Sequence, residues 1–240
     1  MAKFISPSLR DTPGVLSLVL AIVRDDSPEV AKLLGMSPIL AREPLAVGAT
    51  RQAATEFYFK EINHYLFAGD TPLHAAAAGY RNHIAQELIK HGANVAAENR
   101  RGATPLHYAA DGGPVSPGWN PQAQAEMIAF LIKHGANPNT LNKDGVAPLH
   151  RAVRQRCLKA VDALLRNGAG VRLKNKSGST PLHLAVQNTG RRGTGSPMAK
   201  ALQREIFELL LKAGANPEDR DARGKTAKQC SQSDWMHELL

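Results

Sequence analysis

The chain has 240 residues, and thirty Lys and Arg against twenty-one Asp and Glu give it a formal net charge of +9. A hydrophobic content of 43% and a charged content of 21% exclude a disordered chain and a membrane-spanning one. Aromatic residues make up only 5%, so Ala, Leu, Ile and Val must fill the core, which favours helices over a β-sandwich. Two cysteines provide neither a disulfide framework nor a zinc site, so we expect a reducing, cytoplasmic location.

Residues 1–68 lack any repeated motif and are predicted to form a helical N-terminal element. Residues 14–23 are apolar but too short to span a bilayer, and Arg24-Asp25-Asp26 follows them instead of a cleavage site. A buried helix is therefore expected there in place of a signal peptide, paired with a second helix over residues 28–34. We interpret residues 1–68 as a degenerate helical cap with a linker, in which residues 57–67 form a first β-hairpin finger. A small separate domain is the alternative.

A four-residue motif recurs through the rest of the chain. Thr71-Pro72-Leu73-His74 returns beginning at Thr104, Ala147 and Thr180, and the histidines are 33, 43 and 33 residues apart. A glycine stands two residues before each copy, and an apolar pair followed by Gly-Ala stands downstream. Self-similarity at this period is typical of repeat architectures. The predicted units are residues 69–101, 102–144, 145–177, 178–223 and a terminal remnant, 224–240.

The residues of one unit predict its local structure. Thr71 is placed to cap a helix through its hydroxyl, and Pro72 takes the first helical position, where its missing N–H costs nothing. A second helix carries Ile84 and Leu88 on one face and ends at Gly92 in a left-handed turn. A helix pair of this size cannot bury its own apolar face, so the units must stack.

This pattern closely resembles the ankyrin repeat over residues 69–240. The resemblance implies an all-α fold, an α-solenoid of antiparallel helix pairs with β-hairpin-like fingers along one edge. It also implies a non-enzymatic protein–protein interaction scaffold that binds through its finger tips and the concave face of its first helices.

Repeats two and four depart from the 33-residue period by insertions between their two helices. The first insertion covers residues 112–124 and the second residues 190–203. Asn120-Pro121 and Ser196-Pro197 each combine a capping residue with a proline suited to the first helical turn, so both insertions are expected to lengthen the second helix. Insertions of this kind are cheap for a loop to accommodate, so two at one position are either functional or neutral.

Repeat three is unusually basic. Between residues 147 and 178 the only acidic residue is Asp162, and the eight basic residues are Arg151, Arg154, Arg156, Lys159, Arg166, Arg172, Lys174 and Lys176. We interpret this excess of charge as the footprint of an anionic partner, although a solvated helix surface is the simpler alternative. The repeat also has Ala147 in place of the capping threonine and Arg156 where such repeats turn on a glycine.

No catalytic constellation is found. His74, His107, His150 and His183 occupy the repeated motif, where a structural role is expected. Gly224-Lys225-Thr226 lacks the earlier glycine of a phosphate-binding loop. We therefore expect no enzyme activity, no cofactor and no metal.

The hypothesis is that a monomeric chain binds another protein with an acidic surface, and that it does not bind a membrane. Nucleic-acid or polyanion binding through the same basic patch is the alternative. Arg and Tyr are favoured interface anchors, so Tyr108, Arg151 and Arg154 lead the candidate contacts. The full set of predicted binding residues is Arg100, Arg101, Tyr108, Asp111, Trp119, Lys143, Arg151, Arg154, Arg156, Lys159, Lys174, Lys176, Leu184, Gln187, Arg191 and Arg192.

Overall fold

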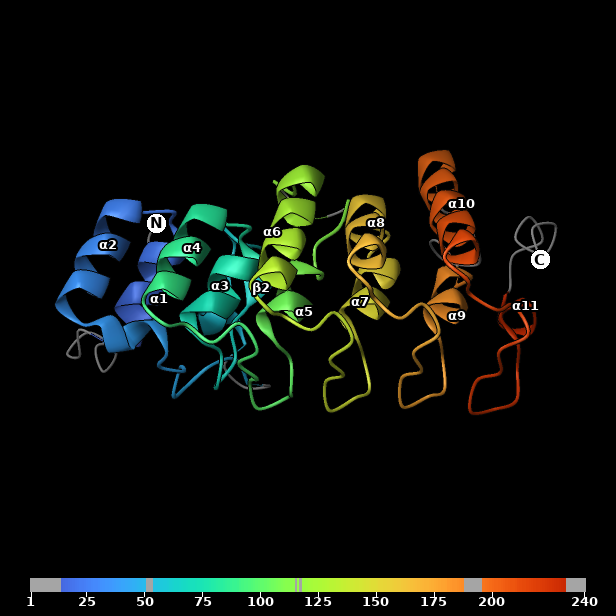
Figure 1. Cartoon of the computed structure of the whole chain (residues 1–240), viewed down its shortest axis with the longest axis horizontal. Coiled ribbons are helices and arrows are strands. Elements are labelled where there is room, and N and C mark those ends of the chain that lie inside the picture. Colours follow the sequence, from blue (N-terminus) through green and yellow to red (C-terminus); the bar gives the residue numbers. More distant parts are fainter. Residues whose placement is uncertain (1–13, 51–53, 115, 117, 188–195, 232–240) are drawn as a thin grey trace. The chain divides into compact units, whose positions relative to one another are not determined.

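The computed structural model describes residues 14–50, 54–114, 116, 118–187 and 196–231. By their internal contacts the residues form two compact units, Met1–Tyr108 and Ala109–Leu240. The units are described separately below, and each element keeps its label in Figure 1. The predicted division into an N-terminal element and an array beginning at residue 69 stays a prediction.

Unit 1 contains helical pairs and one short hairpin. Its elements are α1 (Val15–Val23), α2 (Ser27–Met36), the 3₁₀ turns η2 (Pro38–Ala41) and η3 (Thr55–Phe57), β1 (Tyr58–Phe59), β2 (His64–Tyr65), α3 (Pro72–Ala78), α4 (Asn82–Lys90) and, at the unit boundary, α5 (Pro105–Ala109). The two strands pair antiparallel, with Tyr58 opposite Tyr65. The hairpin lies within the segment predicted to form the first finger.

Helices α1 and α2 pack on the next helix pair in the way one repeat packs on another. Helix α1 contacts α3, and α2 contacts α4. Leu18 and Ile22 of α1 and Leu34 of α2 are fully buried. Asp26 caps α2 by accepting the Glu29 N–H at 3.1 Å. A helix pair therefore lies where the sequence predicted one, and it packs on the helices of the first complete repeat.

Unit 2 is built from two rows of helices. The first helices of the repeats are α7 (Pro148–Arg154), α9 (Pro181–Ala185) and α11 (Ala227–Cys230), and the second helices are α6 (Pro121–Lys133), α8 (Leu158–Arg166) and α10 (Pro197–Lys212). Helix α8 packs between α6 and α10, and α7 packs on both α8 and α9. The largest buried side chains of this core include Met127, Ile128, Leu131 and Phe207.

The insertions lengthen the second helices as predicted. Helix α6 has 13 residues and α10 has 16, whereas the uninterrupted repeat three has a second helix of 9. The Asn120 side chain accepts the N–H groups of Gln122 and Ala123, and the Ser196 hydroxyl accepts that of Ala199. Residues 190–195 of the second insertion lie outside the described residues.

The fingers of unit 2 project from one edge of the helices, as Figure 1 shows. Each finger turns on a glycine with a left-handed backbone. Gly145 has φ +70°, and an added Cβ would come within 2.8 Å of the Lys176 nitrogen. Gly178 has φ +72°, and an added Cβ would come within 2.3 Å of the Ala222 nitrogen. The recurring glycine is therefore required both by the turn and by the close approach of the next finger.

Within the described ranges, no helix combines the length and the apolar character needed to cross a membrane.

Candidate functional site

The repeated histidines belong to the fold. In repeat one, Nδ1 of His74 accepts the Thr71 backbone N–H at 3.0 Å, while Nε2 lies 3.0 Å from the Ala103 carbonyl. His150 and His183 make the same pair of contacts, reaching the carbonyls of Ser179 and Lys225. The carbonyl contact requires a proton on Nε2, and Nδ1 accepts the backbone N–H, so each ring is bonded at both nitrogens. In the part of the chain that the structure describes, no group of three His, Cys, Asp or Glu residues could hold a metal ion.

Each finger tip is organised by one side chain. The Oδ1 atom of Asn175 accepts the backbone N–H groups of Ser177 and Ser179, and Asp221 does the same with those of Arg223 and Lys225. These bonds close the turn from within and leave the neighbouring side chains facing solvent. Lys143 and Lys176, both predicted contacts, are exposed on two such tips.

Arg100 and Arg101 are exposed on the finger of unit 1. The Arg100 guanidinium donates to the Ala49 carbonyl at 3.4 Å. Both residues remain candidate contacts of their own finger.

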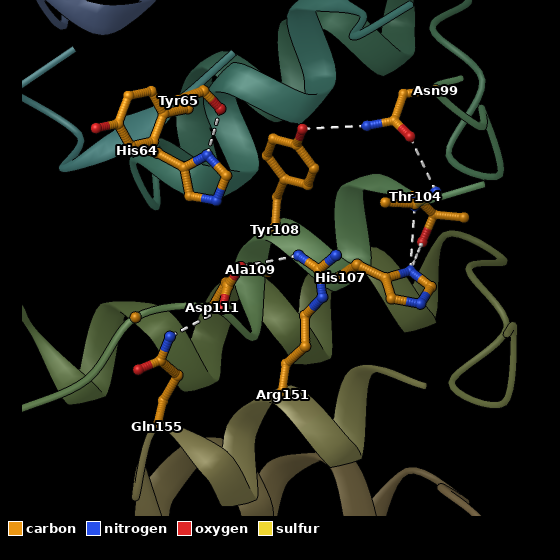
Figure 2. A network of polar contacts seen from close by, with 12 residues as sticks. His64, Tyr65, Asn99, Thr104, His107, Tyr108, Ala109, Asp111, Arg151 and Gln155 are labelled. Atoms are coloured by element: carbon orange, nitrogen blue, oxygen red, sulfur yellow. Dashed lines mark hydrogen bonds and ion pairs between the residues drawn. The ribbon is translucent and has the colours of Figure 1, made fainter. Parts of the chain in front are cut away.

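Tyr108 is a correction to the predicted contact set. It is only 2% exposed, and its hydroxyl lies 2.8 and 2.7 Å from the two carboxylate oxygens of the fully buried Asp70. Asn99 donates to the same carboxylate at 2.8 Å, and the Tyr108 ring lies against the rings of His64 and His74. Figure 2 shows the Tyr108 hydroxyl pointing toward Asn99. Tyr108 therefore stabilises unit 1 and offers no surface to a partner.

Arg151 and Asp111 are brought together in unit 2. The guanidinium donates to Oδ2 of Asp111 at 2.9 Å, and Gln155 donates to Oδ1 at 2.9 Å. The side chains of Arg151 and Asp111 are only 14% and 18% exposed. The charge of Arg151 is therefore compensated within the fold, and the pair joins repeat two to repeat three.

Two further basic residues of repeat three face carboxylates. Arg166 pairs with Asp162 on the same exposed helix face. Arg172 grips Asp219 of the next finger through two hydrogen bonds of 2.9 and 2.6 Å. The hydrogen bonding from Arg172 is the main cause that lowers the pKa of the Asp219 carboxyl, and the positive charges of Arg172 and Lys174 lower it further. Acids from neighbouring repeats therefore neutralise part of the charge that the linear sequence attributes to repeat three.

The remaining cations of repeat three bond to neutral groups or face solvent. Lys159 donates to the Gln122 side chain, Lys174 to the Arg220 carbonyl and Arg156 to the Gln187 carbonyl. Among the described residues, no carboxylate forms an ion pair with Arg154, Lys159, Lys174 or Lys176, which are all exposed. Arg156 has φ +58°, in the left-handed region, and burial lowers the pKa of its guanidinium.

Two buried glutamines explain how the insertions fit the fold. In repeat three the turn after α7 returns the Cys157 N–H to the Ala152 carbonyl. In the inserted repeats the corresponding carbonyls, of Ala109 and Ala185, accept instead from the side chains of Gln124 and Gln203, at 2.9 and 2.6 Å. A side chain thus replaces the backbone donor that the insertion removes.

The same Gln124 holds the predicted contact Trp119. The indole N–H donates to Oε1 of Gln124 at 2.7 Å, and the Cys157 thiol reaches the same oxygen at 2.7 Å. Burial raises the pKa of the Cys157 thiol to about 11. Trp119 is half-buried, so its indole anchors the inserted segment more than it displays an aromatic surface.

The last predicted contacts lie around repeat four. Leu184 is half-buried and Gln187 is exposed, while Arg191 and Arg192 lie outside the described residues. A shallow groove of about 420 Å³ lies between α8 and α10, and its lining includes Lys159, Asp162, Glu205 and Glu208. Because charges of both signs line it, the groove favours no single class of ligand.

The prediction missed the contribution of the fourth finger to the basic surface. Arg220, Arg223 and Lys225 are exposed there. Two of the three acids of the segment, Asp219 and Asp221, are engaged internally, and the third, Glu218, is exposed. The sequence did not reveal this contribution, because residues 216–225 contain three acidic and three basic residues and so suggested a neutral segment.

A family model described as ankyrin repeats (3 copies) matches residues 18–116 and 120–221 of the chain. Ankyrin repeats are generally protein–protein interaction modules without catalytic activity. A search of curated proteins found no significant match. The match extends over most of the chain and includes helices α1 and α2, and the chain therefore belongs to the ankyrin repeat family.

Proposed function

We propose that the chain binds an acidic surface of another protein through the fingers and first helices of unit 2. The observation that carries this proposal is the exposed set Arg154, Lys159, Lys174 and Lys176, for which the described residues provide no carboxylate in an ion pair. Long cationic side chains that are exposed and form no ion pair are available to acidic groups of a partner at small desolvation cost.

Arg151 has a structural role and is not proposed as a direct contact. Within unit 2, its bond to Asp111 connects helix α7 to the segment that precedes helix α6. Reversing the charge of Arg151 would place a second carboxylate against Asp111, so the resulting loss of binding would not distinguish a contact from a folding defect. Arg154, on the same helix and exposed, is the cleaner residue to test.

The test is affinity capture from the native cell lysate with the full chain and the double variant Arg154→Glu, Lys176→Glu. The matched control is Lys133→Glu, Lys212→Glu, which changes the same amount of charge at exposed positions in the last turns of α6 and α10. We expect the first variant to lose a protein partner that the control retains, with both variants folded by circular dichroism. Equal capture by all three proteins would overturn the proposal.

A salt titration distinguishes a protein partner from nucleic acid. Binding to nucleic acid releases about one counterion per neutralised phosphate, so the affinity would fall steeply with salt. Trp119, an aromatic residue near the basic repeat, is half-buried, which limits the ring face that it could offer to a stacked base. Salt also screens the exposed charges of a protein interface, but no condensed counterions are released there, so we expect the affinity for the captured partner to fall with salt by a smaller slope than that for nucleic acid.

A further inference from the structure

Three consecutive fingers of unit 2 carry one structurally equivalent residue each. Leu141, Lys174 and Arg220 immediately precede Asn142, Asn175 and Asp221, the side chains that close the three turns. We call these three residues the finger row. Because they hold the same position in successive repeats, they recur at the spacing of the repeats.

The fingers that carry the row contact one another directly. The Lys176 N–H donates to the Asp144 carbonyl at 3.1 Å, and the Ala222 N–H donates to the Ser177 carbonyl at 3.0 Å. The Lys174 ammonium reaches the Arg220 carbonyl at 2.9 Å. The row is therefore held by backbone and side-chain bonds and is pre-organised for a ligand.

The row combines one apolar member and two cationic members, all exposed. Leu141 is 43% exposed, an unusual exposure for a leucine in this chain. Lys174 and Arg220 are exposed, and the neighbouring Asp219 is already held by two bonds from Arg172. Over residues 172–176 and 218–225, six basic residues stand against the three acids Glu218, Asp219 and Asp221, so the surroundings of the row keep a net positive charge.

The spacing of the row fits an extended chain. Packed helical layers are separated by about 8–10 Å. An extended chain of the polyproline II type advances about 3.1 Å per residue with three residues per turn, so every third residue faces the same side and meets a new finger. We propose that the finger row binds an extended acidic segment of a partner protein, in which an apolar residue faces Leu141 and acidic residues at successive third positions face Lys174 and Arg220. This inference rests on the proposed function and assigns the chemistry of its partner. A phosphodiester backbone offers no apolar group to Leu141.

The test uses two synthetic peptides of equal composition, of about 12 residues each. In the spaced peptide, Leu, Asp and Asp stand at every third position in a Gly/Ser background, made in both chain directions. In the scrambled peptide the two Asp are adjacent and the Leu is terminal. Oligothymidylate of similar charge is the third probe. Binding to the full chain is measured by fluorescence anisotropy.

The spaced peptide is made in two chain directions, and we expect the tighter-binding of the two to bind about tenfold more tightly than the scrambled peptide, a difference of about 1.4 kcal/mol in binding free energy. Lys174→Gln, Arg220→Gln should remove that preference, and Leu141→Ser should weaken the spaced peptide alone. The matched control Lys133→Gln, Lys212→Gln removes two exposed cations in the last turns of α6 and α10 and should leave it unchanged.

Equal affinity for the spaced and scrambled peptides, or tighter binding of oligothymidylate, would overturn the assignment of the finger row. If that occurs while partner capture still depends on Arg154 and Lys176, the proposed function stands and only the extended-segment inference fails. If capture also becomes independent of those residues, the proposed function fails with it.

Discussion

The guanidinium of Arg151 lies 2.9 Å from the carboxylate of Asp111, and both side chains are largely buried. Forty residues separate them in sequence, including the first insertion, yet the fold brings them into one contact. The insertion therefore leaves the packing of repeat two on repeat three intact within unit 2. Arg151, one of the leading predicted contacts of the basic repeat, therefore stabilises the fold.

The first prediction concerns this pair. Arg151→Ala should lower the free energy of unfolding by about 1–3 kcal/mol, because it leaves the Asp111 carboxylate half-buried without its charged donor. The control is Arg166→Ala, which breaks an exposed pair with Asp162 and should cost less than about 0.5 kcal/mol. Urea denaturation of the full chain measures both values. Equal effects would show that the burial of the Arg151 pair contributes nothing.

The second prediction concerns the missing helix cap of repeat three. Ala147 is fully buried at the start of α7, and its backbone N–H already donates to His150. Ala147→Thr should add the hydroxyl contact to the ring that Thr180 makes with His183 at 2.8 Å, and should stabilise the chain by about 0.5–2 kcal/mol.

The reverse substitution provides its control. Thr180→Ala should destabilise the chain by a similar amount, since it removes the same contact from repeat four. A thermal unfolding scan reports both changes, and a lower Tm for Ala147→Thr would mean that the site has no room for the hydroxyl and methyl groups.

The third prediction concerns Gln124, which replaces a backbone donor. Gln124→Met keeps the length of the side chain but leaves the Ala109 carbonyl and the Trp119 indole without their partner, and should cost about 1–3 kcal/mol. The exposed neighbour Gln122, on the same helix, is the control: Gln122→Met should change stability by about 0.5 kcal/mol or less. Tryptophan fluorescence during urea unfolding follows both variants, and indistinguishable midpoints would refute the bridging role.

The fourth prediction is a pH dependence from His150. Burial, opposed by hydrogen bonds to the carbonyls of Ser179 and Leu173, lowers the pKa of this ring from its ordinary value of 6.5. The unfolded chain then binds more protons than the folded one below that value, so stability is fully present above pH 6.5 and falls as the pH decreases toward the lowered pKa.

The control for the fourth prediction is His150→Asn, which removes the titrating ring. The loss of unfolding free energy between about pH 7.5 and pH 5.5 should be smaller in this variant than in the wild-type chain. An equal loss in both proteins would show that His150 does not titrate as described.

Local signals in the sequence predicted most of the fold. The recurring Thr-Pro-Leu-His motif predicted the helix starts, and Asn120-Pro121 and Ser196-Pro197 predicted the lengthened helices, because caps and prolines act within one turn of chain. The candidate surface was predicted less well, because it depends on contacts between repeats. Nothing in the neighbourhood of Tyr108 reveals Asp70, and nothing near Arg172 reveals Asp219, until the repeats are stacked.

Charge counted along the chain was therefore a poor guide to charge presented to a partner. Counting residues 147–178 alone included Arg151 and Arg172, which are engaged by acids of neighbouring repeats, and omitted Arg220, which extends the exposed basic surface to the next finger. An ion pair between repeats changes the available charge without changing the composition.

The most direct test of the central claim is partner capture by the full chain, by Arg154→Glu, Lys176→Glu and by the control Lys133→Glu, Lys212→Glu. The account predicts that the wild-type chain and the control retain the same acidic protein and that the Arg154, Lys176 variant loses it while keeping its helical circular dichroism spectrum. Retention of that protein by the Arg154, Lys176 variant at wild-type levels would contradict the account.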